Sequence, residues 1–375
     1  MIYLDHNATS PVLPEVIDAM MPYFVSEWGN PSSNYRFSSA PKKAMEASRI
    51  QVASLINASP LEILFTSCAT ESNNTALHAA LAAQPTKKHI VTSTVEHASV
   101  LACCSAYEKL GYKVTYLPVD PDGLLSVDEL SRALTPDTAV VSLMWANNET
   151  GVIFPVSEIA LVCHAHGVLF HCDAVQAVGK VSVDMQRVAA DYLSISGHKL
   201  GTPKGVGALY VRSHAPFYPL LHGGNQEKTR RGGTENVPYI VGLGVAAAKA
   251  AAALPDYEIT VAPLRDRLEE LILKSICGAA INGHPSNRLP NTTNIHLPGL
   301  DNTAVLTFLD QADICVSSGS ACMQSAITPS HVISAMSHSS KRADESIRFS
   351  LGLSNTLDEI TKTAEKIISL SQMMR

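Results

Sequence analysis

Two neighbouring stretches of the sequence decide the fold, and they read Val168-Leu169-Phe170-His171-Cys172-Asp173 and Tyr192-Leu193-Ser194-Ile195-Ser196-Gly197-His198-Lys199. Both are apolar runs of strand length, so we predict strands at Val168–Cys172 and Tyr192–Ile195. Each run ends in a side chain that can do chemistry, an acid in the first and a lysine in the second. In layered α/β folds such strand ends gather at one edge of the sheet, where ligands bind.

The same pattern continues on both sides of these stretches. Further strands are predicted at Ile63–Phe65, His89–Thr92, Lys113–Leu117, Ala139–Met144 and Val206–Val211. Helical patterns lie between them, for example at Thr70–Ala82, Ser99–Leu110 and Val156–His166. Strands that alternate with helices predict an α/β fold with a largely parallel sheet.

The pattern changes after about residue 255, which predicts a second domain. A helix at Val261–Cys277 is followed by short strands near Ala280 and Thr293, and the predicted helices that follow are Asn302–Gln311 and Leu357–Met373. We therefore predict a large domain at 15–255 and a smaller α+β domain built from 1–14 and 256–375. A chain of 375 residues is long enough for two cores.

Composition narrows the class of function. The formal net charge of −6 argues against general affinity for nucleic acid or anionic membranes. The apolar stretch Val241–Leu254 contains Lys249 and is too short to span a bilayer. The first residues lack a basic region followed by an apolar run, so we expect a cytoplasmic protein. None of the eight cysteines has the spacing of a zinc site, so no metal is expected.

Four local motifs carry candidate chemistry, and each has a plainer alternative. Lys199 could form a Schiff base with an aldehyde cofactor, although a lone lysine is more often an exposed loop residue. Asp173 could pair with a pyridinium nitrogen, or simply cap a helix. The stretch Thr66-Ser67-Cys68-Ala69-Thr70-Glu71 could hold a phosphate at a helix N-terminus, or be an ordinary cap. His97 could stack on a flat ring, or be a structural histidine.

Together the four motifs meet the demands of pyridoxal 5'-phosphate. They provide a lysine for the aldehyde, an acid for the ring nitrogen, a helix terminus for the phosphate and a ring for stacking. Each follows a predicted strand, so one cleft could hold them all.

At this point the sequence resembles a known family. Ser196-Gly197-His198-Lys199 with Pro203-Lys204-Gly205 is similar to the cofactor-lysine motif of the class V aminotransferase superfamily, of pyridoxal-phosphate fold type I. More narrowly, it resembles the NifS/IscS cysteine desulfurases over residues 3 to about 352. The segments that carry this likeness are Tyr3-Leu4-Asp5, Asn30-Pro31-Ser32-Ser33, Thr70-Glu71-Ser72-Asn73-Asn74, Asn147-Asn148-Glu149-Thr150-Gly151, Arg231-Gly232-Gly233-Thr234-Glu235-Asn236 and Ser317-Ser318-Gly319-Ser320-Ala321-Cys322.

The resemblance implies roles for particular residues. Lys199 matches the Schiff-base lysine, Asp173 the pyridinium partner and His97 the catalytic ring-stacking residue. Arg348 matches the ligand of the substrate carboxylate, with Asn148 also near the substrate, and Cys322 matches the cysteine that takes the sulfur. The other cofactor ligands that it implies are Gln176, Asn148, Ala69, Thr70, Ser196, His198 and Thr234, the last donated by the partner subunit of a homodimer. Cys68 departs from the family, which usually has glycine there.

The implied activity is the removal of sulfur from L-cysteine, which gives L-alanine and a persulfide on Cys322 that passes to an acceptor protein. That acceptor could serve iron–sulfur assembly, tRNA thiolation or DNA phosphorothioation, and we expect no direct contact with nucleic acid or membrane. Three alternatives stay open: a class V aminotransferase, a selenocysteine lyase, and a sulfur-relay partner without turnover. The serine and glycine residues before Cys322 favour the desulfurase and predict a mobile loop.

Overall fold

The computed structural model describes residues 1–319 and 329–374, and its centre is a seven-stranded sheet in the order β2-β8-β7-β6-β5-β3-β4. Neighbouring strands from β7 to β4 are parallel, and β8 pairs antiparallel with both β2 and β7. The strands are β2 Ile63–Thr66, β3 His89–Ser93, β4 Lys113–Leu117, β5 Thr138–Met144, β6 Leu169–Asp173, β7 Tyr192–Ser196 and β8 Gly207–Val211. The predicted α/β fold with a mostly parallel sheet is thereby confirmed.

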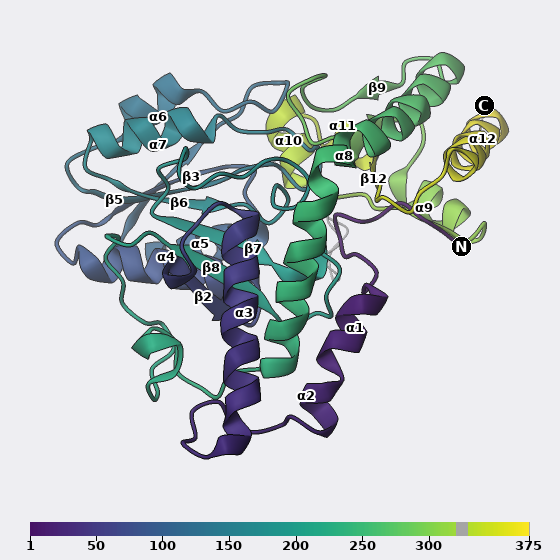
Figure 1. The fold of residues 1–375 in the computed structure, drawn as a ribbon. Helices are drawn as coiled ribbons and strands as arrows, with labels where there is room; N and C mark the ends of the chain where they lie inside the picture. Colours follow the sequence, from purple (N-terminus) through teal and green to yellow (C-terminus); the bar gives the residue numbers. More distant parts are fainter. Residues whose placement is uncertain (320–328, 375) are drawn as a thin grey trace.

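Helices cover both faces of this sheet, which is why its strands read as continuous apolar runs. Figure 1 shows α4 (Ala69–Ala83) and α5 (Ala98–Lys109) on one face, and α6 (Val127–Ala133) and α7 (Val156–Ala165) on the other. All seven residues of β5 are buried between these layers. The strand ends are therefore left as the place where polar side chains can gather.

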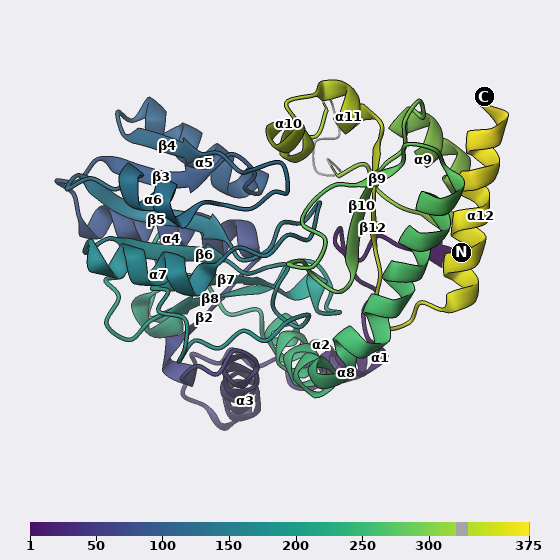
Figure 2. The same cartoon turned by 90° about the horizontal axis from the view of Figure 1, so that it is seen from above.

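A smaller group of elements lies beside the large sheet (Figure 2). It contains an antiparallel sheet in the order β12-β10-β9 and a two-stranded parallel pair of β1 with β11. The elements are β1 Ile2–Tyr3, β9 Ala280–Ile281, β10 Thr292–His296, α9 Asn302–Asp310, β11 Ile314–Cys315, β12 Ser346–Ser350 and α12 Leu357–Met373. Leu4 is completely buried in the apolar cluster of this group, so the first residues join the elements formed late in the sequence.

One long helix, α8 (Val237–Ser275), connects the two groups. The prediction of a separate helix beginning at Val261 is wrong, because α8 continues through Pro255 and Pro263. A proline removes one helical hydrogen bond, but packing can hold the helix across it, and α8 packs along α3 (Ser39–Leu55), α1 (Pro14–Met20) and α12. The domain bounds at residue 255 stay a prediction, since α8 crosses them.

By length and apolar composition α8 could cross a membrane, yet 44% of its most apolar window is buried inside the protein. A core helix of this kind passes the same test as a membrane span, and the helix contacts just described explain its apolar residues. The remaining helical segments are α2 Pro22–Val25, α10 His331–Ser337, α11 Ser340–Asp344, η1 Arg36–Ser38, η2 Pro60–Glu62, η3 Gly197–Lys199 and η4 Gln226–Thr229.

Replacing Leu4 by alanine should lower the free energy of unfolding by about 2–5 kcal/mol, because the truncation leaves a cavity in the smaller apolar cluster. Thermal or urea unfolding of the apoprotein measures this. The control is Leu61→Ala, since Leu61 is 65% exposed and should change stability by about 0.5 kcal/mol or less. Equal stability of the two variants would show that the first residues are not part of this core.

Candidate active site

Lys199 lies directly after β7, in the short helical turn η3. Glycine is required two residues earlier, since a Cβ on Gly197 would lie 2.5 Å from Thr202 Oγ1 and 2.8 Å from Val206 Cγ1. The lysine Nζ donates to the backbone carbonyl oxygens of Asn7 and of Ala8, the latter at 2.7 Å. The N-terminal segment thus reaches the end of the large sheet at this amine.

Asp173 ends β6, the strand beside β7, and is only 6% exposed. Its Oδ1 accepts from the backbone N–H of Val175 at 3.1 Å, and its Oδ2 accepts from Asn73 Nδ2 at 2.8 Å. The first contact closes a turn, and no helix begins after Asp173, so the plainer expectation of a helix cap is wrong. The second contact comes from Asn73 of α4, whose amide is fully buried, and no pattern in the sequence predicted it. Two donors stabilise the ionised carboxylate, which is the form needed to hold a pyridinium proton.

His97 caps the N-terminus of α5, after β3. Its Nδ1 accepts the backbone N–H of Ser99 at 3.1 Å and lies 2.8 Å from the Ser99 hydroxyl. Glu96, the residue before it, is completely buried, and its Oε1 accepts from Ser93 Oγ and from the backbone N–H of Met144. Burial raises the pKa of Glu96 to about 8, so a neutral acid lies beside the predicted ring-stacking residue.

The predicted phosphate loop joins β2 to α4. Cys68 occupies the N-cap position but gives no side-chain cap, so the first backbone N–H groups of the helix, including those of Ala69 and Thr70, stay available for an anion. Cys68 is tolerated where glycine is usual, because its φ of −175° is ordinary extended backbone. Space for it comes from Gly207, where a Cβ would lie 2.9 Å from the Cys68 carbonyl carbon.

Ser196, His198 and Thr234 are three more of the predicted cofactor ligands, and their surroundings differ. Ser196 is buried at the end of β7. Burial, followed by the charges of Lys199 and Lys204, lowers the pKa of His198 to about 4, so this ring is neutral and can donate from one nitrogen. Thr234 is exposed and lines a cavity of about 200 Å³ together with Thr66 and Ser67 of the loop. Its role on a partner's phosphate stays a prediction.

Gln176 and Asn148 reach the same edge. The Gln176 Nε2 donates to the carbonyl oxygen of Asn7 at 3.1 Å, and the backbone carbonyl of Asn148 accepts from Asn7 Nδ2 at 3.1 Å. The sequence did not single out Asn7 or Lys180. Lys180 is buried, and its Nζ donates to Gln176 Oε1 at 2.6 Å and to Asn7 Oδ1 at 2.9 Å. No local signal links Gln176 to Lys180, because residues 175–180 form turns and not a helix.

Arg348, the predicted ligand of the substrate carboxylate, is a residue of β12 and only 2% exposed. Its partner is Asp5, whose Oδ1 accepts from Nη2 at 2.5 Å, and both side chains are largely buried. Its Nη1 donates to the carbonyl oxygen of Asn148 at 3.1 Å, and its Nε has no hydrogen bond among the described residues. The Nε–H group of Arg348 is therefore a donor that no described residue accepts.

Cys322 lies outside the described residues. The described positions on either side of it, Gly319 and Ser330, both meet the buried side chain of Glu149. Ser330 Oγ donates to Glu149 Oε2 at 2.5 Å. Glu149 directly follows Asn148 in the Asn147–Gly151 segment. Gly319 and Ser330 therefore both lie next to a segment that carries predicted site residues.

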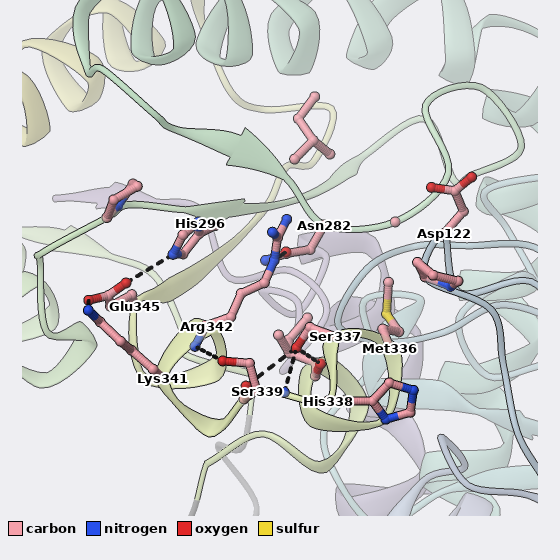
Figure 3. A pocket seen from close by; sticks show the side chains of 15 residues that line it. Asp122, Asn282, His296, Met336, Ser337, His338, Ser339, Lys341, Arg342 and Glu345 are labelled. Atoms are coloured by element: carbon pink, nitrogen blue, oxygen red, sulfur yellow. Dashed lines mark hydrogen bonds and ion pairs between the residues drawn. The ribbon is translucent and has the colours of Figure 1, made fainter.

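A larger cavity, of about 730 Å³, lies elsewhere, beside α10 and α11 (Figure 3). Arg342 Nε donates there to Asn282 Oδ1 at 2.7 Å, and His296 pairs with Glu345 at 3.0 Å. None of the described residues predicted to bind the cofactor lines it. Size alone therefore does not identify the active site.

The residues at the strand ends fit pyridoxal 5'-phosphate. An uncapped helix N-terminus suits its phosphate, the hydrogen-bonded carboxyl group of Asp173 suits its ring nitrogen, and Lys199 supplies the amine for its aldehyde. In the part of the chain that the structure describes, no group of three or more His, Cys, Asp or Glu side chains could hold a metal ion. Fold and site thus define a pyridoxal-phosphate-dependent transferase.

Comparisons with known proteins support the same class of enzyme. The sequence model of the family described as "Aminotransferase class-V" matches residues 2–362. Cysteine desulfurase 2 of Trichormus variabilis is 50% identical over 375 residues, covering 100% of this chain and 94% of the relative. Two solved structures are similar: a NifS-like protein (TM-score 0.93, 35% identity, 99% of both chains) and SspA in complex with cysteine (TM-score 0.83, 34% identity, 95% of this chain and 100% of that one). The chain therefore belongs to the class-V aminotransferases and, within them, to the cysteine desulfurase family.

The contribution of Glu96 to the stability of the apoprotein should fall as the pH rises from about 4.5 to about 8. Over this window the folded protein keeps the Glu96 proton while the unfolded chain has released it, so the folded state binds more protons and the free energy of unfolding falls with pH. Glu96→Gln should remove up to one proton from this slope, about 1.4 kcal/mol per pH unit. Denaturant unfolding at pH 5, 6, 7 and 8 tests it, and parallel curves for parent and variant would contradict a neutral Glu96.

Proposed function

We propose that this chain removes sulfur from L-cysteine, releases L-alanine and carries the sulfur as a persulfide on Cys322 to an acceptor protein. The observation that carries the proposal is the convergence of Lys199, Asp173, His97 and the uncapped start of α4 at one edge of the sheet. The family supports the same chemistry.

The residues divide the work as follows. Bound pyridoxal phosphate supplies an electron sink for the bond between Cα and hydrogen. Asp173 would hold the proton on the ring nitrogen of the cofactor, and the amine of Lys199 would move the proton at Cα. Arg348 holds the substrate carboxylate, with the amide of Asn148 beside it.

Cys322 completes the reaction in this proposal. Its thiolate attacks the sulfur of the substrate, the bond between that sulfur and Cβ breaks, and its electron pair stays with the carbon. Protons taken up at carbon complete alanine, and Cys322 keeps the sulfur as a persulfide. An acceptor thiol then collects it, for iron–sulfur assembly, tRNA thiolation or DNA phosphorothioation in the cytoplasm.

Cys322→Ala should keep the visible band of the bound cofactor but lose nearly all sulfide release and all persulfide on the protein, because no thiolate is left to attack the substrate. Sulfide and alanine assays with L-cysteine measure this. The matched control is Cys277→Ala, which removes an exposed free cysteine and should change the rate less than twofold. Conversion of cysteine to alanine at the parent rate by Cys322→Ala would sink the proposal and favour a lyase reaction that does not use this thiol.

A homodimer with shared sites is part of the same proposal. Thr234 is exposed, and an ion pair of Arg231 with Glu71, 2.9 Å long, ties its segment to α4. If Thr234 acts on the partner's phosphate, a heterodimer of Lys199→Ala with Thr234→Ala contains one intact site.

Mixing these two defective variants in equal amounts after mild dissociation should therefore recover about a quarter of the parent's cofactor-dependent activity, because half of the dimers are mixed and each has one intact site of two. If Thr234 acts within its own subunit, both sites of the heterodimer are defective and no activity returns. A parent chain that is monomeric by sedimentation and fully active would also rule out sharing.

A further inference from the structure

A continuous set of hydrogen bonds joins two residues of the active site that the sequence treats as separate. Asn73, on the buried face of α4, donates from Nδ2 to Asp173 Oδ2 at 2.8 Å and to Ser99 Oγ at 2.9 Å. The Ser99 hydroxyl lies 2.8 Å from His97 Nδ1. One amide therefore links the predicted pyridinium partner to the predicted ring-stacking residue.

The direction of each bond in this set is fixed. The carboxylate of Asp173 can only accept, so the NH2 group of Asn73, rather than its oxygen, must face it. One N–H goes to Asp173 and the other to Ser99 Oγ. The Ser99 hydroxyl, having accepted that bond, uses its own hydrogen to donate to His97 Nδ1. The backbone N–H of Ser99 also points at Nδ1, at 3.1 Å, so Nδ1 carries no proton.

The arrangement has a cost that packing does not explain. Asn73 is completely buried, and its Oδ1 has no hydrogen-bond partner among the described residues. A buried acceptor without a partner costs about 1–3 kcal/mol, and an apolar side chain of the same size would avoid that cost. The amide is thus kept for its two donor groups.

We propose that Asn73 and Ser99 are positioning residues: through one relay they hold His97 as the neutral tautomer protonated on Nε2 and hold Asp173 as an oriented carboxylate. His97 can then exchange a proton only through Nε2, and both residues keep their geometry together. The proposal deepens the proposed function, on which its catalytic consequence rests, whereas the tautomer itself can be measured without substrate or cofactor.

The first measurement uses the apoprotein with 15N-labelled histidine rings, and His97→Gln identifies the signals of His97. In the parent, Nδ1 should show the shift of an unprotonated nitrogen and Nε2 that of a protonated one. Ser99→Ala removes one of the two donors to Nδ1, and Asn73→Leu leaves the Ser99 hydroxyl free to turn away from it. Both variants keep the backbone N–H of Ser99 and should therefore move Nδ1 part of the way towards the averaged shift of mixed tautomers. Ser99→Thr keeps the hydroxyl and should keep the parent pattern.

The second measurement uses the cofactor-loaded protein. Asn73→Leu should displace the pH at which the visible band changes by about one unit and lower kcat tenfold or more with little change in KM, since a hydrogen bond to a charged carboxylate is lost. Ser99→Ala should leave the band's pH response close to that of the parent. Gln84→Leu removes an amide at the far end of α4, where it donates to the carbonyl oxygen of Ala139 at 2.9 Å, and should alter none of these quantities.

Parent-like ring shifts in both Asn73→Leu and Ser99→Ala would overturn the relay, whatever happens to activity. If Asn73→Leu fails to fold, Ser99→Ala against Ser99→Thr still decides. A parent chain that shows the expected tautomer but releases no sulfide from cysteine would instead contradict the proposed function and leave the relay standing.

Discussion

The active-site edge depends on one buried amide, that of Asn7. A polar side chain that is only 2% exposed must satisfy its hydrogen bonds inside the protein, and Asn7 does so with partners from both groups of elements. Its Nδ2 donates to Thr292 Oγ1 at 2.9 Å on β10, and its Oδ1 accepts from Lys180 Nζ at 2.9 Å beside the large sheet. Its backbone carbonyl accepts from Lys199 and Gln176. Separation of the two groups would break these bonds together.

The burial of Lys180 beside Asn7 affects the charge of its amine. Its amine is buried against two amide oxygens, and burial, followed by the charges of Lys199 and Arg348, holds its pKa well below the ordinary value. The Lys180 amine donates to Gln176 Oε1 at 2.6 Å, so the Gln176 NH2 group faces the carbonyl oxygen of Asn7 at 3.1 Å. Lys180, four residues further along the same turn segment, thus directs the Gln176 NH2 group to the carbonyl oxygen that also accepts from Lys199.

Much of this architecture could be predicted, for a physical reason that also sets the limit. The strands are buried on both faces, so their apolar runs end sharply, and the polar residues after β6 and β7 mark the edge of the sheet. Helix α8 was divided wrongly because a change of sequence pattern near residue 255 is a local signal, whereas packing along neighbouring helices is not. Asn7, Asn73 and Asp5 could not be found in advance, since their roles come from contacts with residues about 100 or more positions away.

The parallel pairing of β1 with β11 also bears on how the protein is made. Residues 2 and 3 pair with residues 314 and 315 in this ladder. The backbone N–H of Asn7 donates to Ser350 Oγ, 343 positions further along the chain. On the ribosome the first residues emerge long before these partners exist. The large sheet can assemble during synthesis, but the segment that contacts Lys199 must wait until nearly the whole chain has been released. Loading of the cofactor into its finished site is therefore a late event in the life of the polypeptide, and a nascent chain that stalls before residue 350 leaves the lysine without the carbonyl groups that orient it.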